Sequence, residues 1–149
     1  MPAAQTAINT DAAARLRAVI GKLSRRLRPT ETTLAAGLTP TRLAVLQKVS
    51  WHGSIRLSEL AEAEGINPTM LSRVTADLVE AGLLERASDV GDRRAAWVKA
   101  TAAGKRLNDR IRRERTDALK VALGALSEAE LRKIEKALPA LEQLADGIR

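Results

Sequence analysis

The chain has 149 residues and a formal charge of +7, from 25 Lys and Arg against 18 Asp and Glu. It contains no Cys and a single His, His52, so it lacks the thiolate and imidazole clusters of zinc, haem and iron–sulfur sites, and we expect neither a metal nor a cofactor. Its 45% of hydrophobic residues suffice for the core of one domain, and with no long apolar run and no secretory signal we expect a cytoplasmic protein without membrane contact.

The first predicted element is an amphipathic helix over residues 11–28, which ends at Pro29. Its apolar residues recur at spacings of three and four, which places them on one helix face: Leu16, Ile20, Leu23 and Leu27. Residues 30–38 are predicted to be a linker or a broken helical turn.

A compact helical region follows. Thr39 and Pro40 form an N-cap followed by a first-turn proline, so a second helix is expected to begin here and to stop before Gly53. Residues 57–81 are predicted to form two short helices, because Gly65 favours a helix end and Asn67-Pro68 favours a new start. This is the spacing of a helix-turn-helix.

After Gly82 the period of the pattern changes. Residues 83–87 and 95–100 are two short runs separated by a segment rich in Asp and Gly, which predicts a two-stranded ribbon with a charged tip. Thr101 is the expected N-cap of a long helix that reaches about Ala125.

A last helix is predicted to begin at a capping box formed by Ser127 and Glu130, and Pro139 is expected to interrupt or kink it. It carries a second apolar stripe: Leu131, Ile134, Leu138 and Leu141. The stripes at the two ends of the chain exceed what a small core needs to cover, so a twofold mate is expected to bury them, although such spacing also suits packing within one chain.

Helix, tight turn, helix and ribbon in this order predict a winged helix-turn-helix. The expected fold is mainly α with a small two- or three-stranded β wing, flanked by dimerisation helices. The predicted regions are 1–38 for the first dimerisation helix and linker, 39–101 for DNA binding, and 102–149 for the last dimerisation helices.

The exposed side chains of this motif indicate DNA as the partner. The positive charge is concentrated in residues 1–30 and 73–115, as expected for a protein that binds a polyanion. The second helix of the motif is expected to enter the major groove and to present short polar, basic and apolar groups to the bases. These candidates are Pro68, Thr69, Met70, Ser72, Arg73, Ala76 and Asp77. The alternative for Arg73 is an exposed ion pair with Asp77 one turn along the helix.

The wing supplies further candidates. Arg93 and Arg94 are expected to reach the minor groove, while Asp89 and Asp92 are interpreted as residues that shape the turn. Thr39, Arg42 and Ser58 are predicted to contact DNA phosphates.

Other functions remain open from the residues alone. The basic surface could have no partner, the protein could bind DNA with little sequence preference as an architectural protein, or the winged helix could bind another protein. An enzyme is disfavoured, because His52 and the scattered carboxylates assemble no evident set of general acids and bases.

Several motifs together resemble the MarR family of bacterial transcriptional regulators. They are Leu60-Ala61, Gly65-Ile66-Asn67-Pro68, Leu71-Ser72-Arg73, Leu78, Gly82-Leu83-Leu84-Glu85-Arg86, Asp89, Asp92-Arg93-Arg94, Thr101 and Gly104. The resemblance implies a homodimeric repressor that binds a palindromic operator in double-stranded DNA. It also implies control by a small aromatic or phenolic effector bound between the dimerisation and DNA-binding regions, for which Trp51 and His52 are the candidate pocket residues.

Overall fold

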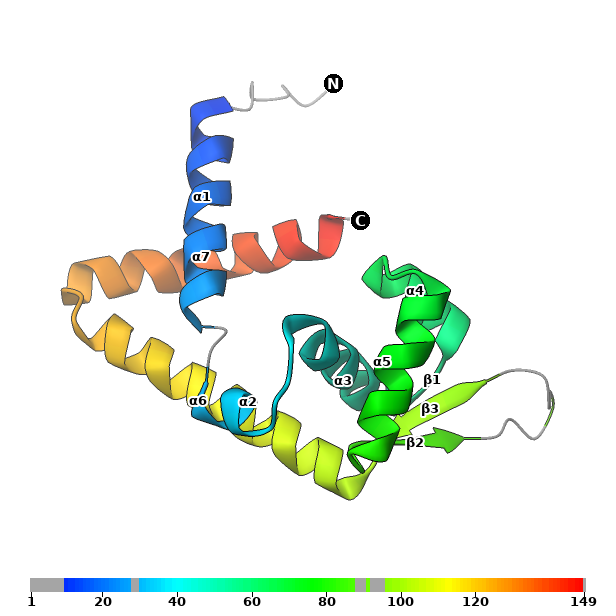
Figure 1. The fold of residues 1–149 in the computed structure, drawn as a ribbon. Coiled ribbons are helices and arrows are strands. Elements are labelled where there is room, and N and C mark those ends of the chain that lie inside the picture. The colour runs from blue at the N-terminus through cyan, green and yellow to red at the C-terminus, as the bar shows by residue number, and fades with distance from the viewer. Residues whose placement is uncertain (1–9, 28–29, 88–90, 92–95, 149) are drawn as a thin grey trace, which may run out of the picture.

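The computed structural model describes residues 10–27, 30–87, 91 and 96–148 (Figure 1). The elements in chain order are α1 (Thr10–Leu27), α2 (Glu31–Ala35), α3 (Pro40–His52), β1 (Ser54–Arg56), α4 (Leu57–Glu64), α5 (Pro68–Glu80), β2 (Leu84–Ala87), β3 (Trp97–Ala100), α6 (Ala102–Gly124) and α7 (Glu128–Gly147). The prediction of a mainly helical winged helix-turn-helix with helices at both ends is confirmed.

The turn between α4 and α5 forms for the reasons that the sequence indicates. Gly65 has a left-handed backbone with φ of 60°, and its N–H donates to the carbonyls of Ala61 and Glu62 at the end of α4. The side-chain oxygen of Asn67 then accepts a hydrogen bond of 2.8 Å from the N–H of Thr69, and Pro68 occupies the first turn of α5.

The wing is a three-stranded antiparallel sheet with the order β1-β3-β2. Ile55 of β1 pairs with Val98 of β3, and Leu84 of β2 pairs with Ala100 of β3. All four side chains are buried, so this strand register places them together on the inner face of the sheet. Strand β1 was not placed by the sequence pattern, since three residues are too few to show a period of two.

The core lies where α3, α4 and α5 meet this sheet (Figure 1). Its fully buried members are aliphatic and come from every one of these elements: Val45, Leu46, Val49, Leu60, Leu71, Leu78, Leu84 and Val98. Because these side chains cover both short helices of the motif, the orientation of α5 is fixed by packing.

The start of α6 is held against the two residues that precede β2. The Thr101 hydroxyl donates a hydrogen bond of 2.6 Å to the carbonyl of Gly82 and accepts one of 3.0 Å from the N–H of Gly104. Gly104 is buried and lies so close to Leu83 that a β-carbon added to it would meet the Leu83 carbonyl oxygen at 2.0 Å. A glycine is therefore required for this approach of helix to wing.

Residues 30–38, predicted as a linker or broken turn, contain the short helix α2. A capping box between Thr30 and Thr33 begins it, and Thr32 binds the carboxylate of Glu114 on α6 through its hydroxyl and, at 3.3 Å, through its N–H. The hydrogen bond from the Thr32 side chain, opposed by partial burial, holds the pKa of the Glu114 carboxyl below its ordinary value.

The two end helices leave their apolar residues uncovered. Neither α1 nor α7 has a buried residue, and none of the closely packed pairs of elements in the described part of the chain involves α7. Ser127 and Glu130 form the predicted capping box, and Pro139 lies inside α7, which is assigned as one continuous helix. Among the described residues no helix has the length and apolar character needed to cross a membrane.

Candidate nucleic-acid interface

Helix α5 presents one polar face to solvent. Its buried residues, Leu71, Val74, Thr75 and Leu78, recur with the helical period. The opposite side exposes the predicted base-contacting residues Pro68, Thr69, Met70, Ser72, Arg73 and Ala76. Met70 is 55% exposed, so an apolar side chain on this face is accessible to a partner.

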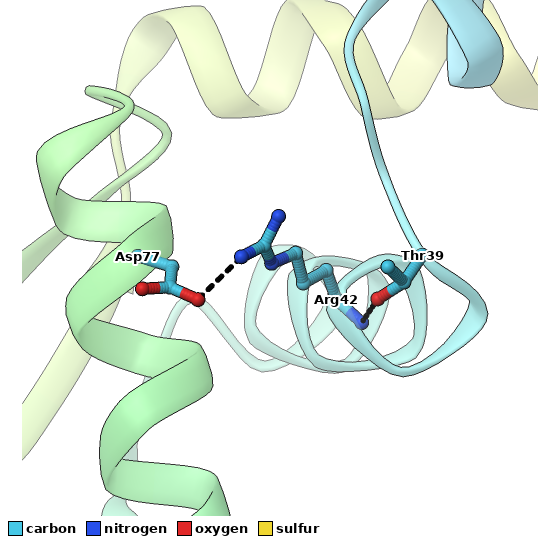
Figure 2. A network of polar contacts seen from close by, with 3 residues as sticks. All are labelled: Thr39, Arg42 and Asp77. Atoms are coloured by element: carbon cyan, nitrogen blue, oxygen red, sulfur yellow. Dashed lines mark hydrogen bonds and ion pairs between the residues drawn. The ribbon is translucent and has the colours of Figure 1, made fainter.

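The seventh predicted residue of this face, Asp77, is half-buried and is bound to α3. Its Oδ2 lies 2.5 Å from Nη2 of Arg42, and both side chains are 37% exposed (Figure 2). The N–H of Arg42 also donates to the hydroxyl of Thr39 at 3.3 Å, which caps α3. Asp77 therefore pairs with Arg42 and not with Arg73, the partner considered from the sequence.

These residues border a groove between the first turns of α3 and the exposed face of α5, which we call the α3–α5 groove. It has a volume of about 510 Å³ and is lined by Thr39, Thr41, Arg42, Asn67, Thr69, Met70, Arg73, Val74 and Asp77. The N-terminal ends of two helices and the guanidinium groups of Arg42 and Arg73 therefore surround one concavity, together with the carboxylate of Asp77. Helix N-termini and guanidinium groups are features that phosphate-binding sites use. The structure thus brings two predicted phosphate contacts, Thr39 and Arg42, beside the predicted base contacts, whereas Ser58 is exposed on α4 outside this lining.

The wing strands carry two further features. The Arg56 guanidinium lies 5.2 Å from the centre of the Trp97 ring, a cation–π contact that joins β1 to β3. Across the outer face, Nζ of Lys99 lies 3.0 Å from a carboxylate oxygen of Glu85. The tip residues predicted to contact or shape the minor-groove interaction, Asp89, Asp92, Arg93 and Arg94, lie outside the described residues.

The predicted dimerisation residues remain accessible. On α1, Leu16 is half-buried, and Ile20 and Leu23 are about half exposed. On α7, Leu131 is half-buried and the others are exposed by 38–46%: Ile134, Leu138 and Leu141.

Two cavities lie between the helices outside the α3–α5 groove. The predicted pocket residue Trp51 is 79% exposed and lines one of them, whereas His52 is exposed and does not contribute to its lining. The other cavity, which sequence reasoning missed, has a volume of about 590 Å³ and is lined mainly by aliphatic residues of α1, α2 and α3 and by Arg115 of α6. The only signal for it was the pair Leu34 and Leu38, one helical turn apart within residues 30–38.

Comparison with known proteins agrees with this geometry. Residues 38–96, which contain the helix-turn-helix and the first part of the wing, match the MarR family. The chain is 27% identical over 110 residues to the HTH-type transcriptional repressor MdtR of Bacillus subtilis, an alignment that covers 74% of this chain and 71% of that protein.

Solved structures extend the similarity to nearly the full chain. A putative transcriptional regulator from Pseudomonas aeruginosa superposes with a TM-score of 0.76 and 29% identity, over 93% of this chain and 96% of that one. Streptococcus pneumoniae FabT, solved in complex with DNA, superposes with a TM-score of 0.70 and 15% identity, over 92% of this chain and 99% of that one, which shows a common fold. Residues 38–96 thus match the MarR family, and the chain as a whole shares the fold of solved transcriptional regulators.

Proposed function

We propose that the protein is a homodimeric repressor that reads a palindromic operator with two copies of α5 and is released by a small effector. The observation that carries the proposal is the exposed face of α5 beside the α3–α5 groove. Arg73 and Met70 stand on this face next to two helix N-termini. A guanidinium can bind guanine through two hydrogen bonds, and the Met70 side chain can contact a thymine methyl group.

The central test is a titration of the protein against the DNA upstream of its own gene and against a scrambled duplex of the same length at about 150 mM salt. We expect the natural sequence to bind at least about a thousandfold more tightly. Equal affinities would indicate an architectural protein, and no binding to either duplex would favour a protein-interaction module. Both results contradict the proposal.

Single substitutions separate base contacts from general charge. Replacing Arg73 by Ala should weaken operator binding by about 1–3 kcal/mol and relax the preference at one base pair. Arg113, an exposed Arg on α6, provides the control. Equal losses for both variants would show that Arg73 acts only through charge.

The wing has its own measurement. Replacing Arg93 and Arg94 together by Ala should lower the slope of log affinity against log salt by about one to two units, one for each lost phosphate-neutralising contact. An unchanged slope would place both side chains away from the DNA.

The homodimer is supported by the uncovered stripes of α1 and α7. Burial of a Leu or Ile side chain contributes about 1.5–3 kcal/mol, so a second copy that covers these faces gains considerable free energy. We expect light scattering after gel filtration to give twice the chain mass for the native protein and the chain mass for the double variant Leu138→Asp, Leu141→Asp. The control Met70→Asp introduces one negative charge at an exposed apolar residue of α5 and should remain dimeric. A monomeric native protein would contradict this part of the proposal.

The effector is proposed to bind in the cavity between α1, α2, α3 and α6. Its lining is mostly aliphatic, with Leu27, Leu34 and Leu43 around it and the guanidinium of Arg115 as a polar group, which suits an aromatic or phenolic molecule. Such a ligand releases DNA only if it binds more tightly to the arrangement that cannot span two half-sites. Adding candidate phenols to the operator complex should therefore lower its affinity, and Leu34→Asp should abolish that response.

A further inference from the structure

The outer face of the wing, which is turned away from the core, carries two rows of side chains across its three strands. Side chains alternate along a strand, so this face is opposite to the one that carries the buried Val98. In one row, Trp97 of β3 pairs with Arg56 of β1 and with Ala87 of β2. The other row consists of Ser54, Lys99 and Glu85.

The row that contains Trp97 is the one next to the loop of the wing. Ala87 is the last residue of β2 and Trp97 is the first residue of β3, so the segment 88–96 is attached to this row at both ends. Arg93 and Arg94, which we propose to contact DNA, precede Trp97 by four and three residues in the chain. A contact that fixes Trp97 therefore fixes one attachment point of the segment that carries both arginines.

Arg56 holds Trp97 from the side of the helix-turn-helix. Its guanidinium lies 5.2 Å from the centre of the Trp97 ring, within the range of a cation–π interaction, and both residues are half-buried. Arg56 is also the N-cap residue of α4, and the N–H of Leu57 next to it donates a hydrogen bond of 2.9 Å to the carbonyl of Ala96. In addition to the strand pairing, a backbone hydrogen bond and a side-chain contact thus join the start of α4 to the start of β3.

The ring of Trp97 is held by its face and not by its polar edge. Its indole N–H is buried and has no hydrogen-bonding partner within the described part of the chain. In the other row, Nζ of Lys99 lies 3.0 Å from the Glu85 carboxylate, an exposed ion pair that joins β3 to β2. Of these two side-chain links, only the one between Arg56 and Trp97 joins the β2–β3 hairpin to the helix-turn-helix.

We propose that Arg56 and Trp97 are a positioning pair, which sets the direction of the β2–β3 hairpin relative to α4 and so places Arg93 and Arg94 against DNA. The pair itself does not contact DNA. Groups that are held in their bound arrangement before binding lose less conformational freedom in the complex, so the pair increases the affinity without adding a contact. This inference rests on the proposed DNA contact of the two wing arginines.

The test is a double-mutant cycle on the affinity for the duplex from upstream of the gene. Trp97→Leu keeps an apolar side chain and removes the aromatic ring, and it should weaken binding about three- to tenfold. In the Arg93→Ala, Arg94→Ala background the same change should have no further effect, because no wing contact is left to position. Unchanged binding by Trp97→Leu, or an equal loss in both backgrounds, would overturn the proposal.

The background variant separates this inference from the proposed function. If Arg93→Ala, Arg94→Ala weakens binding and Trp97→Leu does not, the positioning role fails while the wing contact stands. If the arginine variant binds DNA as the native protein does, the wing contact fails and the positioning role fails with it.

Variants of Arg56 test the other half of the pair without removing a large apolar side chain. Arg56→Gln should match Trp97→Leu, and the two changes together should cost no more than either alone. Arg56→Lys and Trp97→Tyr each keep a cation over an aromatic ring, so both should bind within about twofold of the native protein. Lys99→Gln is the matched control, because it removes one positive charge from the same face. An equal loss for Lys99→Gln, or no recovery in the two conservative variants, would overturn the proposal.

Discussion

Replacement of Gly104 by Ala tests whether the close approach of α6 to the wing holds the DNA-binding region together. The new β-carbon would lie 2.0 Å from the carbonyl oxygen and 3.0 Å from the carbonyl carbon of Leu83, and 3.3 Å from Cδ1 of Leu46. The nearest atoms belong to backbone and not to a flexible side chain, and the same carbonyl accepts a hydrogen bond of 3.1 Å from the N–H of Thr101. Helix α6 and the backbone at Leu83, just before β2, must therefore separate to admit one methyl group.

Two opposing effects set the size of the change. Ala is favoured over Gly within a helix by about 0.5–1 kcal/mol, whereas overpacking a well-filled site costs about 1–3 kcal/mol. Because backbone has to move here, we take the upper end of the overpacking range and expect a net loss of about 2 kcal/mol. For a chain of this length that corresponds to a melting temperature lower by about 4–8 °C.

Thermal unfolding followed by circular dichroism measures this effect, at one fixed protein concentration because association shifts the melting temperature. Gly124, at the end of the same helix, is the matched control, since a β-carbon added there meets no atom within 4 Å. Gly124→Ala should be neutral or slightly stabilising. If both variants melt at the same temperature, the approach at Gly104 does not constrain the fold. The Gly104→Ala variant should also bind the operator less tightly, because the substitution displaces the wing.

Three further changes address side-chain contacts. Asp77→Asn releases Arg42 from its ion pair, so binding to a scrambled duplex should tighten while unfolding changes by less than about 1 kcal/mol; anisotropy titrations that show no change would contradict this. The pKa of Glu114 is lowered in the folded state by its hydrogen bonds with Thr32, so its stabilising effect is present above pH 4.5 and is lost as the pH falls through the lowered pKa. Urea unfolding between about pH 3 and 6 should therefore show a flatter acid limb for Glu114→Gln, and parallel curves would refute the link. Ser127→Ala should cost about 1 kcal/mol at the start of α7 while Ser127→Asp retains the cap, a difference visible in the same unfolding assay.

The DNA-binding region was largely predictable because its signals are local. Gly65 and Asn67-Pro68 fix the turn through their own backbone preferences, and the aliphatic period of α5 determines which side chains face outward. Six of the seven residues predicted to be exposed on α5 are exposed, and the exception is Asp77, which is half-buried beside Arg42.

Contacts between distant segments could not be predicted in this way. Arg42 and Asp77 were each assigned to DNA, and nothing in the local pattern of either residue indicates that they meet across 35 positions of the chain. Helix α2 was missed for the same reason, since its polar segment acquires its stability from Glu114 on α6. The cavity that Trp51 lines likewise lies between α3 and α6, two helices far apart in sequence. His52 was therefore grouped with its neighbour, although only Trp51 contributes to that lining.

The length of α6 has a mechanical consequence. Its 23 residues form a helix about 35 Å long, which follows the wing at one end and leads into α7 at the other (Figure 1). A tilt of only about 5° at one end displaces the other by about 3 Å, close to the spacing of one base-pair step. Because Thr101 and Gly104 attach the helix rigidly to the wing, a ligand wedged against its side would need to move neighbouring atoms very little to misalign two half-sites.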